Sequence, residues 1–281
     1  MFLKMRSILP LLVIFVFLAS CSEYQKALKS EDIKPKYDLA EKFYEEGDYK
    51  RAKRLYEQIA PKYVGKPQGE RVMFFFADCY FKTGDYYLAG YQFERFIKSY
   101  PRSDKIQEAS FLGAKSYYQL SPTYSLDQTD TDKALAKLQT FINTYPESEY
   151  FEEANAMARE LTTKKEKKQL EIAKQFNKLG KFNYPILVSA ITALDNFISD
   201  NPGSVYREEA LYYRIEATTN MALNSTENKK QERLQEALDS YNTLVRYFPE
   251  SQFKKEADNL SDKIQKELSA YTTVSTTSTT K

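Results

Sequence analysis

Four segments of the chain end in the same short pattern, and this repetition constrains the fold more than any other feature. The Pro-x-Ser endings close the segments Phe96–Ser103, Phe141–Ser148, Phe197–Ser204 and Leu244–Ser251. An alanine stands twelve residues before each proline, at Ala89, Ala134, Ala190 and Ala237. A small residue lets a neighbouring helix approach closely, and proline stops a helix because it lacks an N–H. Each segment is therefore predicted to be the second helix of a helical hairpin.

The preceding first helices repeat as well. The pattern in Leu39–Tyr49 returns in Phe76–Tyr86 and in residues 172–182, with a small residue, an aromatic three positions later and glycine four after that. This pattern resembles the tetratricopeptide repeat, of which Glu70–Ser103 is a full 34-residue copy. We expect an all-α fold, an α-solenoid of about five tetratricopeptide repeats. They cover roughly 33–66, 70–103, 107–148, 166–204 and 207–251.

The repeats divide the chain into regions. Residues 33–148 hold repeats one to three, with an insertion at 121–132. Residues 149–271 hold a long helix without Gly or Pro up to 179, an insertion at 183–189, repeats four and five, and a capping helix from 251 to 271. Residues 272–281 are rich in Ser and Thr and have nothing to bury, so a disordered tail is expected there.

The first residues read as a targeting segment. Lys4 and Arg6 precede an apolar run at 8–18, which is too short to span a bilayer but typical of a signal peptide, assigned here to 1–20. The run ends in Leu-Ala-Ser-Cys, which resembles a bacterial lipobox. We expect lipidation of Cys21, followed by a linker at 21–32. The alternative is an ordinary signal peptide with a chance cysteine.

Composition removes most enzyme classes. The chain contains no histidine, no tryptophan and only two cysteines, which excludes Ser-His-Asp and Cys-His sites, His-containing zinc sites and CxxC redox centres. No catalytic residues, no metal and no cofactor other than the lipid on Cys21 are predicted. Without residues 1–20, 39 basic side chains face 39 acidic ones, so a nucleic-acid partner is not expected.

Aromatic residues recur where first helices of such repeats face the concave side. With Ala40, Ala77, Ala114 and Ala173 at position 8, positions 2, 5, 9 and 12 face the groove, and a candidate peptide-binding site is expected there. Its residues are Tyr37, Tyr44, Phe74, Asp78, Phe81, Phe111 and Tyr118. Repeat four has Leu170 and Asn177 instead, so the aromatic rows stop there. Rings offer large contact area at low entropic cost. The alternative is that some of them pack between adjacent repeats.

Taken together, the lipobox, five repeats with Pro-x-Ser endings, the long central helix and a length below 300 residues resemble the BamD family. This is the family of essential lipoproteins in the outer-membrane β-barrel assembly machinery. The Cys21–Tyr24 segment and the insertion at 121–129 look like its Bacteroidetes form.

The resemblance implies a lipid anchor in the outer membrane, facing the periplasm. It also implies that the N-terminal repeats bind unfolded outer-membrane protein precursors and that the C-terminal repeats dock on the periplasmic domains of the barrel component.

Two other classes share parts of these features. One is a Tol-Pal-associated tetratricopeptide scaffold, which normally has a coiled-coil segment and no lipobox. The other is a glycan-binding lipoprotein of the starch-utilisation type, which is larger and uses tryptophan platforms. An enzyme would need a carboxylate pair or a lysine base in a cleft, and no such constellation stands out.

Overall fold

The structure, a computed structural model, describes residues 23–181 and 183–277. The predicted signal peptide, Cys21 and the last four residues of the predicted tail lie outside these ranges. The chain forms two compact units. Unit 1 comprises residues up to 122 together with 127–161, and unit 2 comprises 123–126 and the residues from 162 onward.

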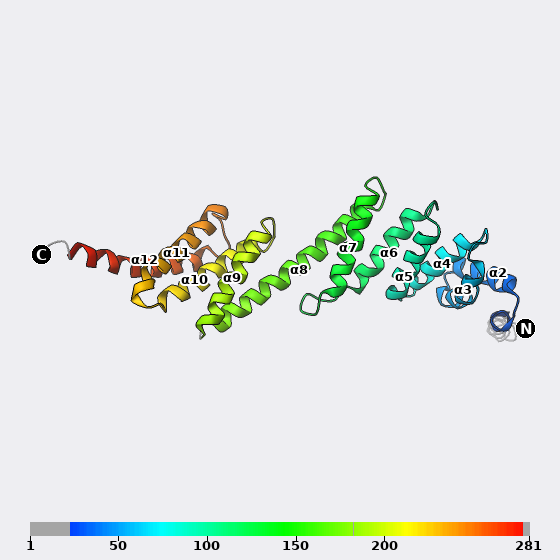
Figure 1. Cartoon of the computed structure of the whole chain (residues 1–281), viewed down its shortest axis with the longest axis horizontal. Coiled ribbons are helices and arrows are strands. Elements are labelled where there is room, and N and C mark those ends of the chain that lie inside the picture. The colour runs from blue at the N-terminus through cyan, green and yellow to red at the C-terminus, as the bar shows by residue number, and fades with distance from the viewer. Residues whose placement is uncertain (1–22, 182, 278–281) are drawn as a thin grey trace, which may run out of the picture. The chain divides into compact units, whose positions relative to one another are not determined.

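Every regular element in the described residues is a helix, and each hairpin expected from the repeats is present. A short helical stretch at 23–29 comes first. Unit 1 then holds α2 (Ile33–Glu45), α3 (Tyr49–Tyr63), α4 (Gly69–Lys82), α5 (Tyr86–Ser99), α6 (Ile106–Leu120) and α7 (Thr129–Thr144). The long helix α8 (Phe151–Gly180) leads to α9 (Tyr184–Asp200), α10 (Arg207–Leu223), α11 (Glu227–Tyr247) and α12 (Lys254–Thr277). Within each unit the helices run back and forth in stacked pairs (Figure 1). The all-α solenoid fold class is confirmed.

The Pro-x-Ser endings have a structural reason that their sequence alone does not reveal. The hydroxyls of Ser103, Ser204 and Ser251 each accept a hydrogen bond from the backbone N–H two residues later, at 3.0–3.1 Å. The Ser204 and Ser251 hydroxyls also donate to Glu166 and Glu208, each at 2.7 Å. Each of these two serines therefore ties the end of its repeat back to the first helix of that repeat.

Glycine closes two of the hairpins as predicted. Gly47 and Gly84 have φ angles of 77° and 80°, a left-handed conformation that L-residues with a side chain rarely adopt. Gly180 differs, because it lies in the last turn of α8 and a Cβ there would stand 2.7 Å from the Leu187 Cα. It is needed for close packing of α9, not for a left-handed turn.

The border between the units lies inside α8, not at 148/149 as the sequence predicted. The reason is that the two halves of α8 belong to different cores. Met157 and Leu161 pack in one cluster with Phe141 of α7, whereas Leu170 shares a cluster with Leu194 of α9.

Three boundaries drawn from sequence are also corrected. The predicted linker contains the helical stretch 23–29, which is docked on repeat one because Tyr24 and Ala27 lie one turn apart and are buried. Residues 184–189, predicted as an insertion, form the first turns of α9. Pro185 is tolerated there because a backbone N–H in the first helical turn would have no partner within the helix. Helix α12 continues to Thr277 instead of ending at 271, since no Gly or Pro interrupts it.

The insertion predicted at 121–132 is only partly a loop, because α7 begins at Thr129. The buried Thr131 hydroxyl donates to the Gln128 Oε1 at 2.8 Å, which fixes the entry into the helix. Among the helices of the described ranges, none combines the length and apolar character needed to cross a membrane.

Candidate functional site

The first helices of repeats one and two bring four side chains of the predicted groove region together, which we call the α2–α4 cluster: Tyr37, Tyr44, Arg71 and Phe75. The Tyr44 and Phe75 rings lie with centroids 4.3 Å apart, and the Arg71 guanidinium lies over the Phe75 ring at 4.6 Å. Tyr37 stacks on Tyr63 of α3 at 5.5 Å. The three rings of the cluster are half-buried and Arg71 is exposed, so this surface is open to a ligand.

Hydrogen bonds hold the cluster in place from below. The Tyr44 hydroxyl donates to Asp78 Oδ2 at 2.6 Å, and Arg71 Nε donates to Glu41 Oε2 at 2.6 Å. Glu41 in turn accepts from the buried Tyr56 hydroxyl at 2.8 Å. Because each polar group that supports the rings is itself hydrogen-bonded, the ring positions are preorganised.

Asp78 was predicted to face the groove, yet it is only 3% exposed. Burial raises the pKa of its carboxyl above the ordinary value, against the hydrogen bond from Tyr44, which lowers it. Its role is therefore to position Tyr44 rather than to contact a ligand.

Phe74 and Phe111 are also buried, at 3% and 2% exposure. Phe74 packs edge-on against Phe96 of α5 at 5.5 Å, and Phe111 stacks on Tyr150 at 4.6 Å. These two rings are therefore buried rather than open to a groove, and Phe74 packs within its own hairpin rather than between adjacent repeats. Position 5 of these helices points into the core because the aromatic residues of the second helices meet it there.

The remaining two predicted residues are half-buried but stand apart from the α2–α4 cluster in the described contacts. Phe81 packs edge-on against Tyr86 of its own hairpin at 5.6 Å. Tyr118 donates its hydroxyl to Glu160 at 2.6 Å, and that bond together with burial raises the pKa of Tyr118 to about 12.

Sequence reasoning did not select Phe75, and it did not name Arg71 although Arg71 occupies position 2, one of the groove-facing positions. Phe75 occupies position 6 of the repeat, which the groove rule does not select. The run Phe74–Phe76 was the available signal, because three consecutive rings on a helix cannot all face one core.

The corresponding face of unit 2 carries paired charges beside two half-buried rings, Tyr212 and Tyr213, and the Lys174 ammonium lies 5.2 Å from the centre of the Tyr213 ring. The Lys174 ammonium bonds Glu171 and Glu209, both at 2.8 Å, and these acids raise the pKa of Lys174 although burial lowers it. Glu216 accepts from Asn177 and from Lys181, each at 2.8 Å. These groups line a depression between α8 and α10 and largely satisfy one another.

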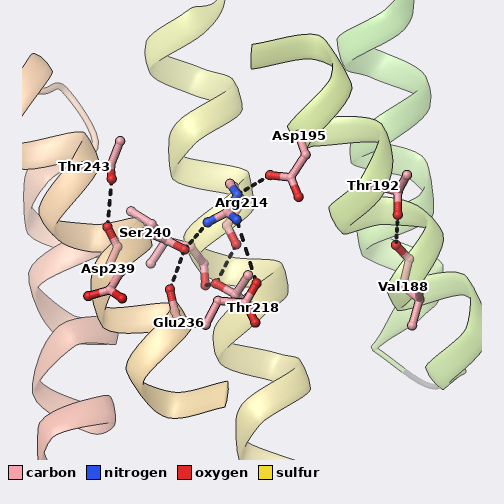
Figure 2. Close-up of polar contacts among 10 residues, drawn as sticks. Val188, Thr192, Asp195, Arg214, Thr218, Glu236, Asp239, Ser240 and Thr243 are labelled. Carbon is pink, nitrogen blue, oxygen red and sulfur yellow. Dashed lines mark hydrogen bonds and ion pairs between the residues drawn. The ribbon is translucent and has the colours of Figure 1, made fainter. Parts of the chain in front are cut away.

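A second polar contact in unit 2 ties three helices together (Figure 2). Arg214 of α10 donates to Asp195 of α9 and to Ser240 of α11, and its guanidinium lies 3.8 Å from Glu236. Asp195, Ser240 and Glu236 are all engaged by the Arg214 guanidinium. We therefore assign this set of residues to holding the three helices together and not to chemistry.

The described residues contain no group of three or more His, Cys, Asp or Glu side chains able to hold a metal ion. The Cys79 thiol is buried, and burial raises its pKa, so it is not poised as a nucleophile.

Comparisons with known proteins complete this description. A solved structure, the TPR2AB domain of yeast Sti1 in a pHSP90 complex, matches with 16% identity and a TM-score of 0.38 over 83% of this chain and 98% of that chain. No curated protein sequence matches the chain. The model of the YfiO family, described as outer membrane lipoprotein, matches residues 30–187 and 183–278, which together span most of the chain. The chain therefore belongs to the YfiO family of outer membrane lipoproteins, the BamD-like family.

Proposed function

We propose that the protein is a non-enzymatic scaffold of the outer-membrane β-barrel assembly machinery. It binds unfolded outer-membrane protein precursors through unit 1 and the periplasmic domains of the barrel component through unit 2. Membership of the outer membrane lipoprotein family supports this function, and so does the hairpin stack, because such stacks bind segments of other proteins.

The α2–α4 cluster is the observation that carries precursor binding. Its half-buried rings beside the exposed Arg71 fit an extended chain that ends in an aromatic residue, since rings stack on rings and a guanidinium pairs with a carboxylate. The equivalent face of unit 2 differs, because its rings Tyr212 and Tyr213 lie beside lysines that pair with glutamates, as in Lys174 with Glu209.

The direct test is the affinity of a fluorescent peptide with a C-terminal aromatic residue, measured by anisotropy. Phe75→Ala is expected to weaken binding by ~1–2 kcal/mol, the range for partly buried interface rings. Phe176→Ala is the matched control, because Phe176 is an exposed ring of unit 2 outside the cluster. Equal affinity of the Phe75 variant and the wild type would exclude this surface as the precursor site.

The anchor requires its own test, because Cys21 lies outside the described residues. In this proposal Cys21 carries the lipid and holds the protein on the periplasmic side of the outer membrane. Cys21→Ala should then incorporate no fatty-acid analogue in metabolic labelling. Wild-type labelling of the variant would show that the lipobox interpretation is wrong.

Docking of the barrel component is tested by pull-down from detergent-solubilised outer membranes. The wild-type protein should retain the barrel component, and a version with unit 2 charges altered, Lys174→Glu, should retain less. Phe75→Ala serves as the control that leaves docking unchanged.

A further inference from the structure

Two positions of the first helix face the preceding helix in the stack, and repeat four differs there from repeats one to three. Taking the shared alanine as position 8, these are positions 7 and 11. Repeat one has Leu39 and Phe43 at these positions, and repeat two has Phe76 and Tyr80. All four side chains are at most 7% exposed. In repeat four they are Ile172 and Phe176, at 41% and 38%.

A helix covers these positions in each of the first three repeats. The 23–29 stretch places Tyr24 edge-on against Phe43 at 5.6 Å. Helix α3 places the Lys53 ammonium over the Tyr80 ring at 4.9 Å. Helix α5 covers Tyr117, because a Cβ on Gly90 would stand 3.0 Å from that ring and Glu94 accepts the Tyr117 hydroxyl at 3.0 Å.

The covering helices share a chemical character. Each is amphipathic and carries a buried small residue, namely Ala27, Ala52 and Ala89 with Gly90. Small residues allow the close approach that brings the larger neighbours onto the ring below.

In repeat four the same face forms an apolar stripe on the second half of α8, made of Ile172, Phe176 and Leu179. These residues are spaced i, i+4 and i+7, so they lie on one helix face, and Leu179 is 58% exposed. The loop at 123–126 lies next to this stripe, because the Leu126 carbonyl accepts a hydrogen bond from Lys168 Nζ at 2.6 Å. Lys168 is one helical turn before Ile172. The Leu126 side chain is 58% exposed and adds apolar surface there.

We propose that this stripe is the docking site for one amphipathic helix of a partner protein, with a small residue at its centre. The occupant is a helix because a helix covers the equivalent face in three internal copies. It comes from another protein because the small residues of the second helices in this chain, Ala52, Ala89, Ala134, Ala190 and Ala237, are already fully buried within the chain itself. A second copy therefore has no free face of the required kind among the described second helices. The site is separate from the α2–α4 cluster and does not rest on precursor binding.

Site-specific photo-crosslinking in intact cells tests the proposal with the full-length protein. A benzophenone amino acid replaces Ile172 or Phe176, and Gln235, an exposed residue of α11, is the control position. Crosslinked peptides are identified by mass spectrometry. We expect both stripe positions, and not the control, to crosslink to one helical segment of a single other protein, with an Ala or Gly in its apolar face.

Variants of the stripe sharpen the test. Leu179→Glu should lower the crosslinking yield at position 176 at least tenfold, while Leu179→Met should retain it. Both should melt like the wild type, because the side chain is exposed. Crosslinks to a second copy of this chain, crosslinks to an extended segment of a precursor, or a yield no higher than that at position 235 would each overturn the proposal.

Discussion

Units 1 and 2 are built from the same hairpin, yet their first-helix faces are chemically different. Unit 1 presents rings held by hydrogen bonds to buried acids, as in the Tyr44–Asp78 pair. Unit 2 presents lysines and glutamates that pair with each other, as in Lys174 with Glu209. Since the alanine at position 8 is buried in both, the repeat scaffold leaves the exposed positions free to differ. The comparison teaches that the repeat pattern encodes packing, while binding chemistry resides in residues outside it.

The largest expected effect compares one repeat position in the two units. Tyr80→Ala should destabilise the protein by ~3 kcal/mol or more, because it leaves a cavity under Lys53 and Phe76. Phe176→Ala should cost clearly less, since that ring is 38% exposed. Chemical denaturation of both variants measures the difference. Equal losses would mean that Phe176 is packed as tightly as Tyr80.

The second prediction asks whether the hairpins of the two units are equally tight. Ala89 in unit 1 and Ala190 in unit 2 are both fully buried. Leucine at either position should overpack its hairpin and cost ~1–3 kcal/mol. Thermal melts check this, and a wild-type melting temperature for one variant alone would show that the units pack their second helices differently.

The third prediction concerns the ring surface itself. Arg71→Ala removes the guanidinium over Phe75 and leaves Glu41 with the Tyr56 hydroxyl as its remaining donor. It should weaken binding of the aromatic-ended peptide by ~1–2 kcal/mol. Lys181→Ala, which removes a comparable exposed cation from unit 2, should leave the anisotropy titration unchanged. If both variants lose the same affinity, then Arg71 contributes to peptide binding through the overall positive charge of the protein and not through the α2–α4 cluster.

The smallest effect is a pH dependence specific to unit 1. The pKa of Asp78 is raised in the folded protein above its ordinary 3.8, so the folded state binds more protons and stability falls as pH rises through this window. Asp78→Asn keeps an acceptor for Tyr44 without the buried charge. It should melt slightly higher than the wild type at pH 7, and the difference should vanish as the pH falls toward 4. The residues that act on this carboxyl are Tyr44, Lys82, Lys105 and Glu108.

A difference that persists unchanged at low pH would mean that the substitution acts through packing. The equivalent position in unit 2 offers a contrast, because Lys174 is stabilised in its charged form by Glu171 and Glu209. Removing its charge should therefore not raise the melting temperature at pH 7.

The repeat spacing by itself determined the helices and their pairing. The repeated spacing places a fully buried alanine in every second helix. Gly47 and Gly84 adopt positive φ angles where the chain turns between helices. Both features follow from steric effects that act within a few residues of the chain. These local rules are legible in one sequence because they do not depend on what packs above or below.

Only the tertiary structure decided which rings bind and which pack. Phe74 and Phe75 are neighbours in sequence, yet one is buried against Phe96 and the other lies open beside Arg71. The border inside α8 and the open stripe at Ile172, Phe176 and Leu179 were equally invisible, because exposure depends on whether a neighbouring helix arrives. That is a property of contacts between residues far apart in the chain, which a periodic pattern along the chain does not contain.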